Sequence, residues 1–153
     1  MLRISKLTDY GTLVLAELPA RGTGLASAGQ IAQTTHLGHA TVSKLLKAFV
    51  RAGLVTSERG SHGGYALARS EDEITAADII NSIEGPVAIT ECSSAASRCS
   101  LERTCSVGSA WQGINLSIRR ALTQVTLADL QTRRLPMPLP NFHDTIHGSS
   151  ANR

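Results

Sequence analysis

The chain has 153 residues, of which 42% are hydrophobic but only 3% aromatic, and a formal net charge of +3 at pH 7. This length suits one compact domain with a short extension, and the apolar content allows a core of aliphatic side chains. No stretch is apolar enough to span a bilayer or to form a signal peptide, so we expect a cytoplasmic protein without a membrane partner. In that compartment the three cysteines are expected to be ligands or redox groups, not a disulfide scaffold.

The positive charge is divided unevenly along the chain. Residues 1–70 contain eight Lys/Arg and three Asp/Glu, whereas residues 71–91 contain six acidic residues and no Lys or Arg. A basic N-terminal half favours binding to a polyanion. Solvated surface lysine and arginine would give the same totals, so the prediction of a nucleic-acid partner depends on the pattern of elements.

The first two predicted helices differ in length. One is predicted from Thr8 to Leu18, with Thr8 as its N-cap and Asp9 where a helix N-terminus favours negative charge. A shorter helix follows the candidate N-cap Ser27, and residues 36–38 form the turn after it.

Residues 42–51 form the most strongly patterned helix. Its apolar residues recur at steps of three and four, which gives one buried stripe. They are Val42, Leu45, Leu46, Phe49 and Val50. The opposite face has small polar and basic residues and no acid. It consists of Thr41, Ser43, Lys44, Lys47 and Arg51. Gly53 is the left-handed residue expected after the last turn.

Two short strands follow this helix directly. They are predicted over residues 54–56 and 65–67, and the glycine-rich turn over 58–64 carries Arg59 and His62 near its tip. A short helix, a tight turn, a longer basic helix and a hairpin make a winged helix-turn-helix, whose second helix enters the major groove. The predicted fold is therefore mainly α with a small β-hairpin wing.

The polar face of the second helix is predicted to contact double-stranded operator DNA, because one α-helix fits the major groove. Thr41 and Ser43 are small enough to approach base edges closely. Lys44 and Lys47 can reach bases or phosphates, and Arg51, further along the helix, is placed to contact phosphate.

The predicted wing adds two further contacts. Gly60, Gly63 and Gly64 allow a tight loop to approach the DNA, so that Arg59 can lie along a narrow minor groove, where negative potential is concentrated. His62 is at the same tip and belongs to the predicted DNA surface. The alternative for Arg59 is a solvent-facing hairpin residue.

The second half of the chain contains two more predicted helices. The first spans residues 74–84 and starts with a capping pair of Thr75 and Asp78. Apolar residues then recur at steps of three or four in Trp111, Ile114, Ile118, Leu122 and Val125. This is the seam of a long helix that pairs with another helix, and packing against its own domain is the alternative. We favour a homodimer, because two winged helices related by a two-fold axis match a palindromic operator.

These elements divide the chain into four parts. Residues 1–85 form the winged helix-turn-helix domain, 86–108 the cysteine loop, 109–131 the dimerisation helix, and 132–153 a disordered tail. Within the third part, residues 126–130 form a short capped turn.

Three cysteines, Cys92, Cys99 and Cys105, lie in the cysteine loop with six and then five residues between them. Thiolates bind soft metals, as zinc ions or iron–sulfur clusters. Zinc sites usually bring cysteines in close pairs, whereas wide and nearly even spacing suits a larger cluster. Arg98 and Arg103 can offset the negative charge of such a cluster. Free or redox-active thiols without metal are the alternative.

Together, the helix-turn-helix, the wing sequence Arg59-Gly60-x-x-Gly63-Gly64-Tyr65, the cysteine spacing and the long helix resemble the IscR/NsrR-type iron–sulfur transcriptional regulators. The branch that controls the SUF cluster-assembly operon looks most similar, and the resemblance covers about residues 1–131. It implies a homodimer with a 2Fe–2S or 4Fe–4S iron–sulfur cluster on the three cysteines. It also implies DNA contacts at Ala40, Thr41, Ser43, Lys44 and Arg59.

The fourth cluster ligand is where this chain departs from IscR. IscR has a histidine three residues after its last cysteine, and the matching residue here is Gly108, which has no side chain. In NsrR-like members an aspartate in the first helix of the other subunit is the ligand, and Asp9 is at the matching position. Glu91, Glu102 and an external thiol are the rivals. The alternative role of Asp9 is to stabilise the N-terminus of its own helix.

We therefore interpret the chain as a dimeric repressor that senses iron–sulfur status, oxidative stress or nitric oxide and controls cluster-assembly or related genes. A winged-helix regulator with a thiol–disulfide or zinc switch is the second hypothesis. A cluster-carrying electron-transfer or scaffold protein is the third. We expect neither an enzyme nor a small-molecule substrate, because no acid–base pair, nucleophile triad or phosphate-binding loop is present.

Overall fold

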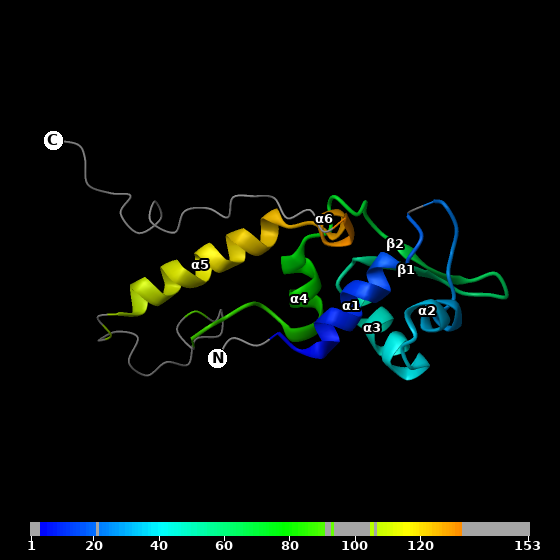
Figure 1. Cartoon of the computed structure of the whole chain (residues 1–153), viewed down its shortest axis with the longest axis horizontal. Coiled ribbons are helices and arrows are strands. Elements are labelled where there is room, and N and C mark those ends of the chain that lie inside the picture. Colours follow the sequence, from blue (N-terminus) through cyan, green and yellow to red (C-terminus); the bar gives the residue numbers. More distant parts are fainter. Residues whose placement is uncertain (1–3, 21, 91–92, 94–104, 106, 133–153) are drawn as a thin grey trace.

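The computed structural model describes residues 4–20, 22–90, 93, 105 and 107–132. Its elements are α1 (Lys6–Ala16), α2 (Ala28–Thr35), α3 (His39–Arg51), β1 (Val55–Glu58), β2 (Gly64–Leu67), α4 (Ala76–Glu84), α5 (Gly108–Gln124) and α6 (Leu127–Thr132). Helix α5 projects from the other helices on the side opposite to the β1–β2 hairpin (Figure 1). The predicted class, mainly α with a small hairpin, is confirmed.

The helix-turn-helix forms where the sequence predicts it. Ser27 caps α2 through a reciprocal pair of bonds: its hydroxyl accepts the Gln30 N–H at 3.2 Å, and the Gln30 side chain accepts the Ser27 N–H at 2.8 Å. His36 then takes a left-handed conformation, φ 56° and ψ 24°, which ends α2 and begins the turn. Gly53 has φ 71° and follows the end of α3, as predicted.

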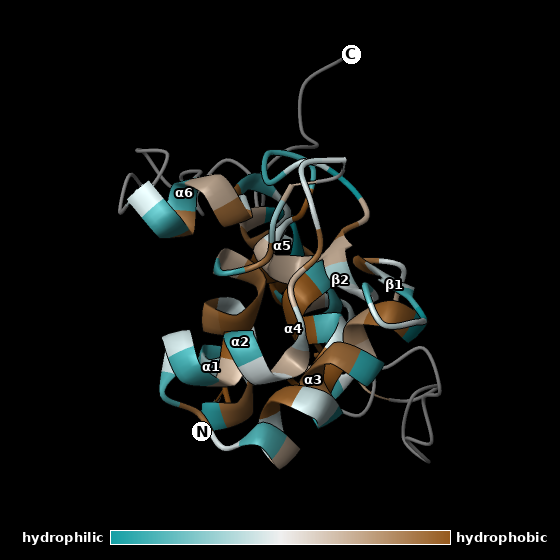
Figure 2. Cartoon of the chain, turned by 90° about the vertical axis from the view of Figure 1, so that its right-hand side faces the viewer, coloured by the Kyte–Doolittle hydropathy of each residue, from teal (hydrophilic) through white to brown (hydrophobic). Residues whose placement is uncertain are grey.

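The apolar stripe of α3 is the centre of the core. Val42, Leu45, Leu46 and Phe49 are at most 1% exposed, and α3 packs against α1, α2 and α4. Full burial of one such side chain contributes roughly 1.5–3 kcal/mol. In Figure 2 the apolar (brown) segments gather where the helices face one another. Because this stripe faces inward, the opposite face of α3 is turned to solvent.

Helix α1 differs from its prediction at both ends. The predicted limits, Thr8 and Leu18, are wrong, and so is Thr8 as the N-cap, because α1 starts at Lys6 after the N-cap Ser5. Thr8 is 7% exposed inside the first turn, and its hydroxyl donates to the carboxylate of Glu84. The Thr8 hydroxyl, which the local pattern assigned to capping, therefore bonds to a partner that is distant in the sequence.

Strands β1 and β2 form the wing. They pair antiparallel with Ser57 opposite Tyr65, and residues 59–63 connect them. The backbone N–H and C=O of Tyr65 also bond to Ala26, at 2.9 and 3.0 Å. This pairing fixes the loop before α2 against the hairpin, so the wing and the helix-turn-helix are held in one geometry.

The segment 109–131, predicted as one dimerisation helix, contains two helices. Helix α5 ends at Gln124, because Val125 is extended with φ −97° and ψ 123°. The predicted short turn is α6, whose first turn is capped by Thr126: the Thr126 N–H donates to Asp129 at 3.0 Å, and the Thr126 hydroxyl accepts the Asp129 N–H at 3.1 Å.

Helix α6 belongs to the winged-helix core. Leu127 is fully buried, and α6 packs against α1. The backbone around the break is paired with the start of α4: the Leu127 N–H donates to the Ile74 carbonyl and the Ala76 N–H to the Val125 carbonyl, each at 2.8 Å. Within the predicted dimerisation segment, only α5 remains outside that core.

Helix α4 begins with the predicted capping pair. The Thr75 hydroxyl accepts the Asp78 N–H and the Asp78 carboxylate accepts the Thr75 N–H, both at 3.1 Å. The predicted tail from residue 133 onward and most of the cysteine loop lie outside the described residues. In the ranges that are described, no helix is long and apolar enough to cross a membrane.

His36 is the one non-glycine residue with a positive φ in the described part of the chain. A left-handed conformation costs a residue with a Cβ roughly 1–2 kcal/mol, and the extra freedom of glycine in the unfolded chain offsets part of this. We expect His36→Gly to raise the free energy of unfolding by up to about 1 kcal/mol, measured by urea denaturation. Gln33→Gly, inside α2, should lower it by about 1 kcal/mol. A loss of stability in His36→Gly would contradict this turn geometry.

Candidate functional site

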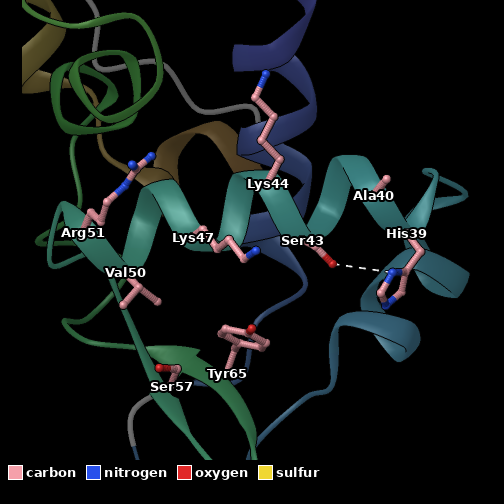
Figure 3. A pocket seen from close by; sticks show the side chains of 9 residues that line it. All are labelled: His39, Ala40, Ser43, Lys44, Lys47, Val50, Arg51, Ser57 and Tyr65. Carbon is pink, nitrogen blue, oxygen red and sulfur yellow. Dashed lines mark hydrogen bonds between the residues drawn. The ribbon is translucent and has the colours of Figure 1, made fainter.

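A concave surface, which encloses a volume of about 780 Å³, lies between α3 and the hairpin (Figure 3). It is lined by His39, Ala40, Ser43, Lys44, Lys47, Val50, Arg51, Ser57 and Tyr65. Figure 3 shows Lys47 extending from α3 toward the hairpin, where the Tyr65 ring points back at the helix. Lys44 extends from the other side of α3 in the same view. The helix and the wing thus shape one surface.

Most predicted DNA contacts on α3 come together on this surface. These are Ala40, Ser43, Lys44, Lys47 and Arg51. Thr41 does not line it and is half-buried in the first turn of α3. Arg59 and His62 are exposed in the hairpin turn, outside the concave part. The two predicted wing contacts therefore form a separate tip.

The concave surface is cationic. Lys44, Lys47 and Arg51 line it, and no Asp or Glu does. The pair Arg69–Asp78, at 3.4 Å, is the one salt bridge among the residues that the structure describes, so no carboxylate in that part of the chain neutralises these three side chains. A positive surface around an exposed helix matches a major groove flanked by phosphates.

Sequence reasoning missed the hairpin side of this surface. Ser57 and Tyr65 face each other across the β1–β2 ladder, and both line the concave surface. It also missed His39, whose ring nitrogen lies 3.5 Å from the Ser43 hydroxyl (Figure 3). The spacing of four between His39 and Ser43 was the available signal for the helix, whereas strand alternation in the hairpin separates its two faces without saying which one faces α3.

Gly63 is required by the shape of the wing. A Cβ at this residue would collide with the backbone carbonyl oxygen of Glu58 and lie 2.9 Å from the carbonyl carbon of Arg59. Because these are backbone atoms, they cannot rotate away as a side chain could. Gly63 therefore lets the turn fold back on itself with Arg59 at its tip.

Helix α1, which carries Asp9, is attached to the end of α4. Ser5 makes no side-chain cap bond at the start of α1. Instead the Glu84 carboxylate accepts the Ser5 N–H at 2.8 Å and the Thr8 hydroxyl at 2.7 Å. A negative group is favourable at a helix N-terminus and unfavourable at the C-terminus of its own helix. Glu84, the last residue of α4, therefore acts as the cap of α1.

These bonds predict a pH dependence of stability. The hydrogen bond from Thr8, followed by that from the Ser5 backbone, holds the pKa of Glu84 below its ordinary value. Since the folded state has the lower pKa, the stabilisation is present above the unfolded value, about 4.3, and is lost as the pH falls below it. Solvent exposure of Glu84 limits the contribution to less than about 1 kcal/mol.

We expect Glu84→Gln to lower the thermal unfolding midpoint at pH 7 and to change it less near pH 3, because the stabilisation from the charged carboxylate declines as the pH falls below the unfolded value. Circular dichroism at both pH values measures the difference. Glu17→Gln, which removes an exposed acid from the other end of α1, is the matched control and should not lower the midpoint. Equal effects of Glu84→Gln at the two pH values would contradict the role of the charge.

Of the predicted cysteine ligands, the structure describes Cys105. Its thiol is free and exposed, and α5 begins three residues later. A Cβ at Gly108 would lie 3.8 Å from the Cys105 sulfur, so the absence of a side chain there leaves the space beside the sulfur open. Cys92, Cys99, Glu91 and Glu102 lie outside the described residues.

Asp9 is exposed in the first turn of α1. It lies at a groove of about 320 Å³ between α1, α4 and the C-terminal end of α5, together with Ile80 and Leu122. In the described part of the chain, no three His, Cys, Asp or Glu residues are close enough to hold a metal ion. Asp9 is therefore available at the surface without belonging to a ligand group in these ranges.

Helix α5 is only partly covered by its own chain. Trp111 and Leu116 are 43% and 46% exposed, and Val107, just before the helix, is 54% exposed. Ile118 and Leu122 of the predicted seam instead line a groove next to α4. The seam is thus divided between the chain's own domain and an open apolar surface near the cysteine loop.

Comparison with known proteins identifies related regulators. A profile of the Rrf2 family, described as iron-dependent transcriptional regulators, matches residues 4–133. The HTH-type transcriptional regulator CymR of Bacillus subtilis is 41% identical over 91 residues, which are 59% of this chain and 66% of CymR. These relatives are regulators and not enzymes, in agreement with the sequence prediction.

Solved structures give the same grouping. The structure of CymR from B. subtilis, described as the global cysteine regulator, has a TM-score of 0.64 and 34% identity, and the match covers 87% of this chain and 98% of CymR. The structure of IscR from T. potens has a TM-score of 0.59 and 29% identity, with 93% and 95% of the two chains covered.

Proposed function

The chain belongs to the Rrf2 family of transcriptional regulators, and on that premise we propose that it is a homodimeric, cytoplasmic repressor of the iron–sulfur-sensing type. In this proposal its winged helices bind double-stranded operator DNA, and a cluster held by Cys92, Cys99 and Cys105 sets the operator affinity. The signal is iron–sulfur status, oxidative stress or nitric oxide, and the genes are those of cluster assembly or related ones.

The observation that carries the DNA-binding part is the cationic surface between α3 and the hairpin. Lys44, Lys47 and Arg51 line it, and the small residues Ala40 and Ser43 line it nearer the N-terminal end of α3. Small residues let the helix approach base edges, while long basic side chains reach phosphates beside the groove. A two-fold dimer would present two such helices to a palindromic operator.

We expect Lys47→Ala to weaken binding about equally for all duplex sequences and to reduce the salt slope of log affinity by about one, because one phosphate contact is lost. Fluorescence anisotropy with a labelled operator at several salt concentrations measures both quantities. Arg120→Ala, which removes an equal charge from the exposed surface of α5, should change neither. An unaltered salt slope in Lys47→Ala would remove this residue from the DNA surface.

The surroundings of Cys105, the predicted thiol ligand that the structure describes, support an iron–sulfur cluster. Cys105 supplies an exposed thiol, Gly108 leaves its sulfur uncovered, and the N-terminus of α5 favours an anionic group nearby. The resemblance assigns two further thiolates and gives the fourth position to Asp9 of the partner subunit. Exposure of Asp9 on its own chain is what such a shared ligand requires. A bound cluster would supply bonds that oxygen or nitric oxide can break.

The helix contacts offer a route from the cysteine loop to the DNA surface. Helix α5 packs against α4, and α4 packs against both α1 and α3. Glu84 also attaches the start of α1 to the end of α4. A displacement of α5 or α1 would therefore act on the helices that hold α3. Coupling between two sites is typically about 1–3 kcal/mol, which changes operator affinity about 5–150-fold.

The decisive measurement is an oxygen-free absorption spectrum with native mass, followed through iron loss. We expect wild-type protein to contain iron and sulfide, and the native mass to distinguish a 2Fe–2S from a 4Fe–4S cluster. Asp9→Ala should lose the cluster faster, because one protein ligand is removed, and Asp9→Asn should behave similarly since it keeps the size but not the charge. Asp72→Ala, which removes another exposed acid, is the control.

Two outcomes would overturn different parts of this proposal. Wild-type loading and an unchanged spectrum in Asp9→Ala would exclude Asp9 as a ligand and leave the cluster in place. Wild-type protein without iron and sulfide would exclude the cluster itself.

A thiol-based response is the second candidate, and the similarity to CymR favours it. CymR is described as a cysteine regulator, and Cys105 of this chain is a free, exposed thiol. In this alternative the cysteines change operator affinity through a disulfide or a zinc ion. Colourless, iron-free protein prepared without oxygen, whose operator affinity still responds to an added disulfide reagent, would select it.

A further inference from the structure

Asn115 is the one buried residue of α5, at 4% exposure. Helix α5 is otherwise half-buried or exposed, and its apolar residues Trp111 and Leu116 are left open to solvent. A buried amide costs free energy unless its donors and its acceptor are paired. An apolar side chain would satisfy this position without any partner, so the bonds of the amide need an explanation.

The two ends of the Asn115 amide bind the backbone of the segment that follows α4. Its oxygen accepts the Ile89 N–H at 3.3 Å, and its nitrogen donates to the Ser93 carbonyl at 3.5 Å. The Ser93 hydroxyl in turn donates to the Trp111 carbonyl at 3.5 Å, one turn earlier on α5. Residues 89 and 93 are thus both held against the same turn of the helix.

The bonds of Asn115 lie on both sides of Cys92, at the start of residues 89–107, which contain the three cysteines and are called the cysteine segment here. In the sequence Cys92 lies between Ile89 and Ser93, and Cys105 lies just before α5 begins. One end of the segment is therefore joined to α5 through the chain itself, and the other end is joined to it through Asn115. Fixing both ends lowers the entropy cost of bringing two thiols of this segment to a shared ligand.

We propose that Asn115 is a positioning residue that fixes the start of the cysteine segment to α5. A change of ligation in this segment would then act on α5 through both ends of the segment. The inference rests on the proposed function for its sensing role. The attachment itself can be measured on metal-free protein.

The test compares Asn115→Ala and Asn115→Asp with wild type in the full-length protein. Asn115→Asp keeps the acceptor for the Ile89 N–H but turns a carboxylate oxygen toward the Ser93 carbonyl oxygen in a buried site, so it should disrupt the attachment at least as much as Asn115→Ala. Thr123→Ala is the matched control, because among the described residues the Thr123 hydroxyl bonds within α5, to the Arg120 carbonyl.

In metal-free protein, hydrogen exchange at the Ile89 amide and alkylation of Cys92 are followed by mass spectrometry. Loss of one or two hydrogen bonds should speed both in Asn115→Ala by about 3- to 30-fold. Cys105 alkylation and operator affinity of the metal-free protein should stay near the wild-type values, which separates positioning from general unfolding. In oxygen-free loaded protein, cluster loss should be faster by a similar factor.

The outcomes separate the two claims. Exchange and alkylation at wild-type rates in Asn115→Ala would overturn the inference, whether or not a cluster binds. If metal-free Asn115→Ala opens the segment but wild-type protein holds no iron and sulfide, the attachment stands and the proposed cluster function fails. If loaded Asn115→Ala keeps its cluster as long as wild type, the sensing role of Asn115 is overturned.

Discussion

Burial of one face of α3 is the constraint on which the proposed DNA surface depends. Val42, Leu45, Leu46 and Phe49 are almost fully removed from solvent against the neighbouring helices. Helical geometry then places residues such as Lys47 on the opposite side, facing the hairpin. The contact that supplies much of the core's stability therefore also orients the basic face. A different inward stripe would turn that face away from the wing.

Helix α4 connects the two ends of the molecule. It packs against α3 on one side and against α5 on the other (Figure 1). Two sets of hydrogen bonds fix the positions of the elements next to α4. The Glu84 carboxylate caps α1, and the Asn115 amide binds the segment that follows α4. Hydrogen bonds to backbone groups specify position more narrowly than apolar contact does. The winged helix itself serves regulators with different signals, so the signal depends on the chemistry attached to this frame.

The candidate site was predicted best where it lies on one helix. Lys44, Lys47 and Arg51 follow from their position opposite an apolar stripe, which periodicity reveals directly. Ser57 and Tyr65 could not be assigned in the same way. Strand alternation separates two faces of a hairpin, but it does not say which face turns toward α3. That choice depends on how the hairpin is attached to the loop before α2.

Short-range pattern in the sequence determined the helix-turn-helix, the wing, the caps at Ser27 and Thr75 and the basic face of α3, because these features join residues close together in the chain. The tertiary structure alone decided where α1 starts, that α6 packs into the winged-helix core, and what Asn115 binds. Glu84 lies 76 residues from Thr8, its hydrogen-bond donor. Packing of the apolar faces brings such partners together, and the local sequence around either one does not identify the other.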